Sequence, residues 1–118
     1  MPERARVFVA EDDKRYQELI ESFLTRAGHS IVLKAETFDD AIKAVEQFSE
    51  LDVQVATIDG NLDPNDTSGY DGRALVEAIS RLAPNVKTVG MSGSDIKGVT
   101  VDLGKRNIVG LGEVVTNL

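Results

Sequence analysis

Residues 6–13 have the sequence RVFVAEDD, a short apolar run that ends abruptly in three acidic residues. The apolar residues from Val7 to Ala10 are typical of a strand buried on both faces, as in a parallel sheet. From Tyr16 to Leu24 the apolar side chains recur at helical spacing, and Ala27-Gly28 supplies a signal for the end of a helix. We therefore predict a strand with acidic side chains at its carboxyl end, followed by a helix.

The same strand-then-helix unit recurs along the chain. Further strands are predicted at 30–35, 53–58 and 86–91. Further helices are predicted from an Asp39-Asp40 cap to Phe48 and, after a loop that Asp71-Gly72 closes, from Leu75 to Leu82. Weaker signals favour a short helix at 95–102, a fifth strand at Ile108-Val109 and a last helix at 113–118. Because parallel strands need crossover connections, this alternation predicts an open parallel sheet with helices on both faces.

Length and composition restrict the class of protein. The chain has 118 residues, which favours a single domain over 1–118. It carries 13 Lys and Arg against 20 Asp and Glu, a net charge of -7 that argues against direct nucleic-acid binding. It has no cysteine, and its apolar runs are too short for a membrane span or a signal peptide. We expect a cytoplasmic protein without a membrane partner.

Polar side chains gather where the predicted strands end. Glu11 and Asp12 follow the first strand, Asp59 follows the third and Ser92 follows the fourth. If the first and third strands are neighbours, as in a flavodoxin-like sheet, the three carboxylates converge in one crevice. Oxygen ligands favour Mg²⁺ or Mn²⁺ over zinc, and a cation there would neutralise an incoming phosphoryl group. Asp59 is then a plausible phosphoryl acceptor.

These residues resemble the receiver domain of bacterial and archaeal two-component response regulators. The resemblance rests on RVFVAEDD at 6–13, on TIDGNL at 57–62 with Pro64 and Asp71-Gly72, and on VGMSGS at 89–94. It covers nearly the whole chain. It implies a flavodoxin-like (βα)5 fold: a doubly wound, parallel five-stranded sheet of order 2-1-3-4-5, here with a short fourth helix and a truncated fifth.

The resemblance also implies roles for individual residues. Asp59 matches the phosphoacceptor, and Ser92 matches the switch hydroxyl. The implied Mg²⁺ (or Mn²⁺) ligands are Asp12, Asp59 and the backbone carbonyl of Asn61, with Glu11 in the outer sphere. Gly93 matches the small residue that leaves access to the pocket, and the side chains of Asn61 and Ser94 are expected to modulate phosphoryl lifetime.

The implied partners are a sensor histidine kinase or phosphotransfer protein as donor and an unidentified output protein. The chain is not expected to be an enzyme, beyond assisting its own phosphorylation and dephosphorylation.

Departures from the family pattern support a rival hypothesis. With the fifth strand at 108–109, no lysine closes that strand, and Asp59 lacks its usual cation. Lys105 or Arg106 could replace it from a neighbouring loop, and Ile108 stands at the aromatic switch position. The missing lysine favours a pseudo-receiver, a protein-binding module that acts without phosphorylation. The acidic cluster and Ser92 favour the phosphoacceptor.

Other interpretations are weaker. The segment IDGNLDPND at 58–66 resembles a haloacid-dehalogenase motif, but Thr57 occupies the nucleophile position. It also fails as an EF-hand, with Pro64 at the sixth position and Tyr70 at the twelfth. The sequence contains no nucleotide-binding glycine loop, so it does not favour a kinase or a phosphatase. His29 is expected at the surface, and Tyr16 is expected in the core.

Overall fold

The fold is one parallel sheet with helices on both faces. The computed structural model describes residues 4–60, 62, 70–92 and 96–118. The strands are β1 (Arg6–Ala10), β2 (Ser30–Ala35), β3 (Val55–Ile58), β4 (Lys87–Gly90) and β5 (Val101–Asp102). The helices are α1 (Lys14–Arg26), α2 (Phe38–Val45), α3 (Tyr70–Leu82) and α4 (Leu111–Thr116), with a 3₁₀ helix, η1 (Lys105–Gly110). The strand order is β2-β1-β3-β4-β5, which confirms the predicted flavodoxin-like topology.

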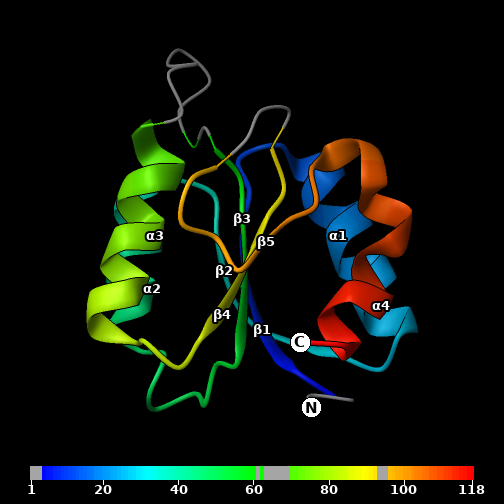
Figure 1. The fold of residues 1–118 in the computed structure, drawn as a ribbon, viewed down its shortest axis with the longest axis horizontal. Helices are drawn as coiled ribbons and strands as arrows, with labels where there is room; N and C mark the ends of the chain where they lie inside the picture. The colour runs from blue at the N-terminus through cyan, green and yellow to red at the C-terminus, as the bar shows by residue number, and fades with distance from the viewer. Residues whose placement is uncertain (1–3, 61, 63–69, 93–95) are drawn as a thin grey trace.

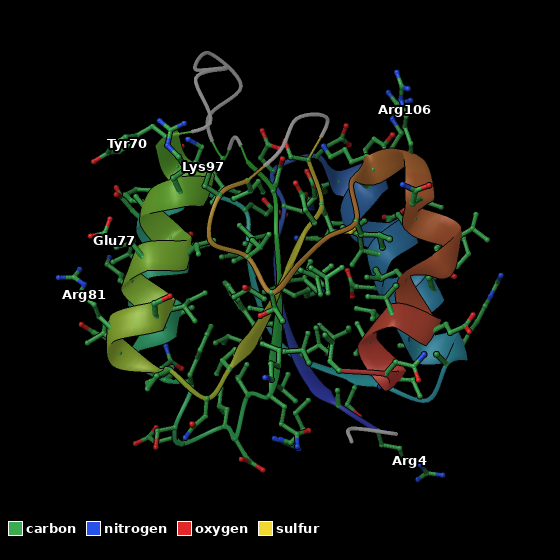
Figure 2. All side chains as sticks on the ribbon, viewed as in Figure 1. Arg4, Tyr70, Glu77, Arg81, Lys97 and Arg106 are labelled. Carbon is green, nitrogen blue, oxygen red and sulfur yellow. The ribbon has the colours of Figure 1, made fainter. Side chains whose placement is uncertain are left out.

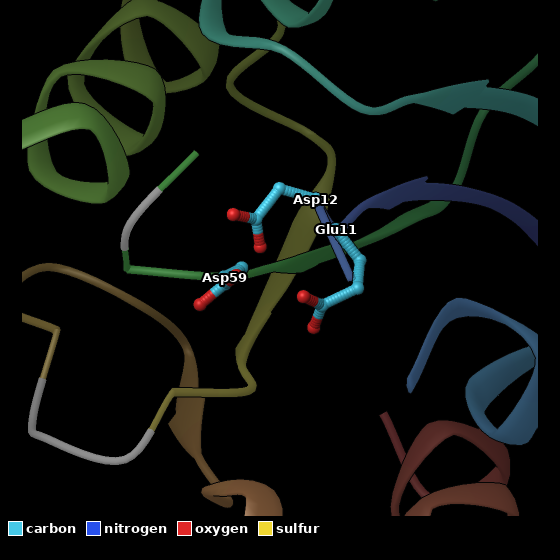
Figure 3. A group of neighbouring side chains, drawn as sticks. All are labelled: Glu11, Asp12 and Asp59. Carbon is cyan, nitrogen blue, oxygen red and sulfur yellow. The ribbon is translucent and has the colours of Figure 1, made fainter. Parts of the chain in front are cut away.

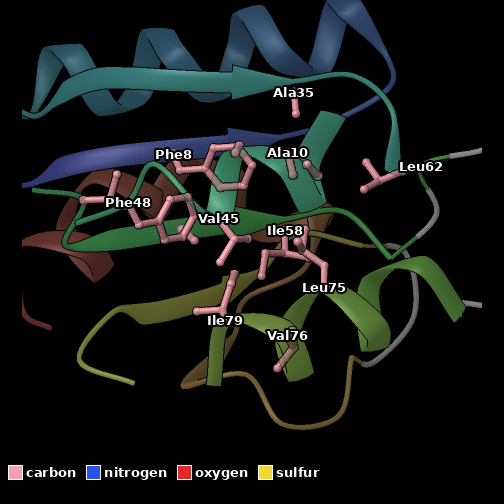
Figure 4. Close-up of a cluster of buried hydrophobic side chains, with 14 of the residues drawn as sticks. Phe8, Ala10, Ala35, Val45, Phe48, Ile58, Leu62, Leu75, Val76 and Ile79 are labelled. Carbon is pink, nitrogen blue, oxygen red and sulfur yellow. The ribbon is translucent and has the colours of Figure 1, made fainter. Parts of the chain in front are cut away.

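The two faces of the sheet carry separate hydrophobic clusters. Figure 1 shows α2 and α3 on one face and α1 and α4 on the other. Because side chains alternate along a strand, Phe8 packs toward α2 and α3 while Val7 and Val9 pack toward α1 and α4. Phe8 contacts Phe48 with ring centroids 5.1 Å apart, at the centre of the cluster in Figure 4. The central strands β1 and β3 are nearly continuous apolar runs because both of their faces are covered.

Side-chain caps fix where the first two helices begin. The side chain of Asp13 caps α1 by accepting a hydrogen bond from the backbone N of Arg15 at 2.9 Å. The cap of α2 is Thr37, whose hydroxyl accepts from the backbone N of Asp40 at 3.2 Å. The predicted Asp39-Asp40 cap is therefore wrong by two residues, and these aspartates lie in the first turn, where the helix dipole favours negative charge.

The connection from β4 to β5 differs from the prediction. The fifth strand is Val101–Asp102, whereas Ile108 and Val109 lie in η1. The predicted helix at 95–102 is wrong for the part that the structure describes: residues 96–100 form no helix. Gly98 has a φ of 89°, a left-handed conformation that interrupts a helix and that glycine adopts without strain.

Side chains close this short connection. The backbone N of Thr88 donates to Thr100 Oγ1 at 3.0 Å, and the backbone N of Thr100 donates to Thr88 Oγ1 at 2.9 Å. The backbone N of Ile96 donates to Asp102 Oδ2 at 3.2 Å. Such local side-chain bonds give the backbone of residues 96–100 an alternative to a helix. The last helix is short, as predicted, but it begins at Leu111.

His29 is buried, which contradicts the predicted surface position; its exposed fraction is 3%. Its Nδ1 accepts a hydrogen bond from the backbone N of Ala5 at 2.9 Å. The proton therefore lies on Nε2, which is 3.2 Å from the carbonyl O of Gly112 and 3.0 Å from Thr116 Oγ1. His29 thus joins the start of β1 to α4. Within the described residues, no helix is long and apolar enough to cross a membrane.

His29→Ala should lower the free energy of unfolding by about 2 kcal/mol, because it leaves a buried N–H without an acceptor and opens a gap beside α4. Thr116→Val is the matched control. It removes one of the two groups that face Nε2 and should cost less than about 1 kcal/mol. Urea unfolding of the three proteins measures this, and equal losses in the two variants would contradict the joining role of His29.

Candidate functional site

Three carboxylates meet at the carboxyl end of the sheet. The register pairs Ala10 of β1 with Ile58 of β3, and the backbone N of Asp59 donates to the carbonyl O of Ala10 at 3.0 Å. Glu11 and Asp12 therefore leave β1 beside Asp59. One carboxylate oxygen from each of these three residues lies within 4.8 Å of the others. Figure 3 shows the carboxyl groups turned toward a common space, so the predicted convergence is confirmed.

Glu11 is fully buried in this cluster. Its Oε2 accepts a hydrogen bond from the backbone N of Asp13 at 3.2 Å, whereas its Oε1 has no hydrogen-bond partner. Burial raises the pKa of Glu11 from 4.5 to about 9, reinforced by the adjacent carboxylate of Asp59. Without a metal ion, Glu11 is therefore protonated at neutral pH.

Lys105 brings a positive charge into the cluster. Its Nζ lies 3.4 Å from Glu11 Oε2 and 3.7 Å from Asp59 Oδ2. Burial would lower the pKa of Lys105, but the negative charge of Asp59 and the interaction with Glu11, which accepts a hydrogen bond from Nζ, outweigh this effect and raise it. The expectation that Asp59 lacks a cation is wrong, because it rested on a fifth strand at 108–109. Of the two alternatives, Lys105 reaches the carboxylates, whereas Arg106 is exposed and extends away from the sheet (Figure 2).

The backbone of Lys105 is attached to the end of β4. Its N donates to the carbonyl O of Ser92 at 3.2 Å, and the preceding N of Gly104 donates to the carbonyl O of Gly90 at 2.9 Å. Gly104 has a φ of 78°, which turns the chain out of β5 and into η1. The lysine thus enters the site from a tight turn directly after β5.

Sequence reasoning missed Tyr16 as part of this site. Tyr16 lies on α1, where its helical spacing predicted a core position. Instead its ring is only partly buried, and the Nζ of Lys105 lies 4.4 Å from the ring centroid. This distance defines a cation–π contact. The available signal was the position of Tyr16 in the first turn of the helix that follows Glu11 and Asp12.

Ser92 lies beside the backbone that follows Asp59. It is buried at the end of β4, and a Cβ on Gly60 would lie 2.6 Å from Ser92 Oγ. A Cβ on Gly72 would in turn lie 2.7 Å from the Cα of Gly60. These two glycines permit a close approach of the ends of β3 and β4 and the start of α3, which places Ser92 against Gly60, the residue after Asp59.

Several predicted positions lie outside the described residues. They are the Asn61 backbone carbonyl, Gly93 and Ser94. Tyr70 begins α3, so Asp71 and Gly72 lie in this helix and not in the predicted loop. The side chain of Tyr70 is exposed, with its ring centroid 6.5 Å from that of Phe38.

The described donors fit a hard divalent cation. They are carboxylate oxygens, without sulfur or imidazole, and such donors suit Mg²⁺ or Mn²⁺. The unpartnered Oε1 of Glu11 is a buried acceptor in the same cluster. A cation, directly or through a bound water, would satisfy this atom and favour the ionised form of Glu11.

No protein-family model and no curated protein sequence matches this chain. Several solved structures are similar to it. A CheY-like response regulator receiver domain protein from Methanospirillum hungatei is 19% identical, with a TM-score of 0.76 over 97% of this chain and 92% of that chain. The signal receiver domain of a modulated diguanylate cyclase from Desulfovibrio desulfuricans, described as an example of alternate folding, is 14% identical. Its TM-score is 0.72, over 97% of this chain and 94% of that chain.

A third similar structure is a CheX–CheY complex from Borrelia burgdorferi containing BeF3⁻ and Mg²⁺. It is 16% identical, with a TM-score of 0.66 over 79% of this chain and 65% of that chain. These similarities concern the fold. The chain has the fold of response-regulator receiver domains, and it carries an acidic cluster at the carboxyl end of the sheet.

Glu11→Gln should flatten the pH dependence of stability in the metal-free protein. Between pH 4.5 and about 9 the unfolded chain ionises Glu11 while the folded protein keeps the proton, so the free energy of unfolding falls as pH rises. Glutamine mimics the protonated carboxyl and removes this titration. Lys105 titrates above the window, because its pKa is raised from 10.5.

Urea unfolding in EDTA at several pH values measures this difference. Asp13→Asn is the control, because asparagine also caps helices and Asp13 shows no ion pair with Lys105. Its pH slope should match that of the unsubstituted protein. If the free energy of unfolding falls with pH equally steeply in Glu11→Gln and in the unsubstituted protein, the raised pKa of Glu11 is contradicted.

Proposed function

We propose that this chain is a phospho-accepting receiver domain of a two-component phosphorelay, phosphorylated on Asp59. The observation that carries the proposal is the position of Lys105 Nζ, 3.7 Å from Asp59 Oδ2, within a cluster of carboxylates. A buried carboxylate with a cation beside it can attack phosphorus and then keep the charge of the product balanced.

The proposed donor is the phosphohistidine of a sensor histidine kinase or a phosphotransfer protein. A carboxylate oxygen of Asp59 forms a bond to phosphorus while the P–N bond to the imidazole breaks, and the released imidazole takes a proton from water. Lys105 stabilises the negative charge on the phosphoryl oxygens. In this role the chain is a phosphoacceptor that assists its own phosphorylation and dephosphorylation, without acting on other substrates.

The proposed cofactor is Mg²⁺ or Mn²⁺. Asp12, Asp59 and the backbone carbonyl of Asn61 would hold the ion, with Glu11 in the outer sphere. When bound, the cation supplies charge neutralisation between the acidic cluster and the phosphoryl group. The oxygen donors and the unpartnered Oε1 of Glu11 support this assignment.

The new charge on Asp59 is proposed to draw the hydroxyl of Ser92 inward. Because the backbone N of Lys105 is bonded to the carbonyl O of Ser92, a shift of Ser92 would move the start of η1 as well. The phosphorylated form would thereby favour one of two arrangements of this surface, read by a partner protein. Near the acceptor, Gly93 is proposed to leave access, and the side chains of Asn61 and Ser94 to modulate phosphoryl lifetime.

A second candidate function is a pseudo-receiver that binds a partner without phosphorylation. The missing lysine was its main support, and the contact of Lys105 with Asp59 removes that support. What favours it still is the fold alone, since binding modules can share the receiver topology. The ion-paired acidic cluster favours the phosphoacceptor.

Intact mass after incubation with a small-molecule phosphodonor and Mg²⁺ tests the proposal. The unsubstituted protein should gain the mass of one phosphoryl group, and the gain should vanish in EDTA. Asp59→Asn should gain none, because its amide is not a nucleophile. Asp13→Asn, a change of a neighbouring acid that retains the helix cap, should gain the group as the unsubstituted protein does.

Beryllofluoride, which mimics a phosphoryl group, provides a second readout by NMR. No adduct and no beryllofluoride-dependent shift in a protein with a folded spectrum would contradict the phosphoacceptor and favour the pseudo-receiver.

A further inference from the structure

The contact between Tyr16 and Lys105 joins two elements that are distant in sequence. Tyr16 lies in the first turn of α1, and Lys105 is the first residue of η1. The ammonium group contacts Glu11 and Asp59 on the side of the sheet and the ring of Tyr16 on the side of α1. It is thus held between negative charge and an aromatic ring.

The carboxylates hold this ammonium group only through long contacts: Nζ donates a hydrogen bond to Glu11 Oε2 and lies near Asp59 Oδ2. Charge-assisted N–H···O bonds are about 2.7–2.9 Å long, whereas the two distances from Lys105 Nζ are 3.4 and 3.7 Å. The lysine stem has several rotatable bonds, and ordering it costs conformational entropy of up to about 2 kcal/mol. Its side chain is 22% exposed, so water competes for the ammonium. The ring of Tyr16 adds a further contact on the opposite side.

Phosphorylation would alter the carboxylate contacts but leave the ring contact unchanged. Asp59 would become an acyl phosphate, and its carboxylate charge would pass to phosphoryl oxygens at a new position. The ring of Tyr16 carries no formal charge and undergoes no chemical change in this step. Its attraction for a cation therefore persists before and after the transfer.

We propose that Tyr16 is a positioning residue for Lys105: its ring holds the ammonium group at Asp59, ordered in advance for the transferred phosphoryl group. This inference rests on the function proposed above and adds a residue to that site. Preorganised charge stabilises a transition state without reorganisation at the moment of reaction, so loss of the ring should slow phosphorylation.

The first test measures the rate of phosphoryl uptake from a small-molecule donor with Mg²⁺ at neutral pH. Tyr16→Leu should slow uptake about fivefold, the effect of losing roughly 1 kcal/mol of cation–π attraction. Tyr16→Phe keeps the ring face and should restore the rate to within about twofold. Leu19→Ala, an exposed change on the same helix, should leave the rate unchanged.

The second test reads the contact itself, without phosphorylation. A ring current shifts protons above an aromatic face upfield, so the ε-methylene protons of Lys105 should be shifted in the NMR spectra of the unsubstituted protein and of Tyr16→Phe. The shift should vanish in Tyr16→Leu. Urea unfolding of each variant, with its free energy and slope, establishes that the rates compare folded proteins.

The outcomes separate this inference from the proposed function. If the unsubstituted protein takes up phosphoryl but Tyr16→Leu does so equally fast, or Tyr16→Phe is as slow as Tyr16→Leu, the positioning role is wrong and the phosphoacceptor stands. If the unsubstituted protein takes up none, the proposed function fails, and the role of Tyr16 in it fails as well, whatever the ring current shows.

Discussion

The repulsion among three carboxylates is the constraint on which the rest of this site depends. The register of β1 against β3 forces Glu11, Asp12 and Asp59 together at one edge of the sheet. Such a cluster requires bound protons or positive charge to be stable. The metal-free protein uses both, a proton on Glu11 and the ammonium of Lys105. Under the proposed function, a divalent cation would displace that proton and neutralise the same cluster.

The short β4–β5 connection determines how the positive charge reaches the cluster. Paired hydrogen bonds between Thr88 and Thr100 close the connection, and β5 has only two residues. Gly104 then turns the chain so that the backbone of Lys105 lies against that of Ser92. The candidate switch residue and the cation are thus mechanically linked. In this arrangement the start of η1 is bonded directly to the residue at the candidate switch position.

Sequence patterns predicted the parts of the molecule that rest on local periodicity. Apolar runs that end in acidic residues predict β1 and β3. If these two strands are neighbours in a parallel sheet, Glu11 and Asp59 must lie close together. The patterns failed where structure depends on distant contacts. A strand of two residues is too short to show an alternation of apolar side chains. The sequence therefore predicts the fifth strand at 108–109, where two apolar residues adjoin, and leaves Lys105 in a loop. An aromatic residue at helical spacing looks the same whether it packs in the core or over a lysine, as Tyr16 does. The burial of His29 depends on α4, which is distant in sequence.

The most direct test of this account is a crystal structure of the protein with Mg²⁺ and beryllofluoride. The account predicts beryllium bonded to a carboxylate oxygen of Asp59, with Lys105 Nζ within hydrogen-bond distance of a fluorine atom and still over the ring of Tyr16. A beryllofluoride group on Asp59 whose fluorine atoms contact Arg106 or water, with Lys105 turned to solvent, would contradict it.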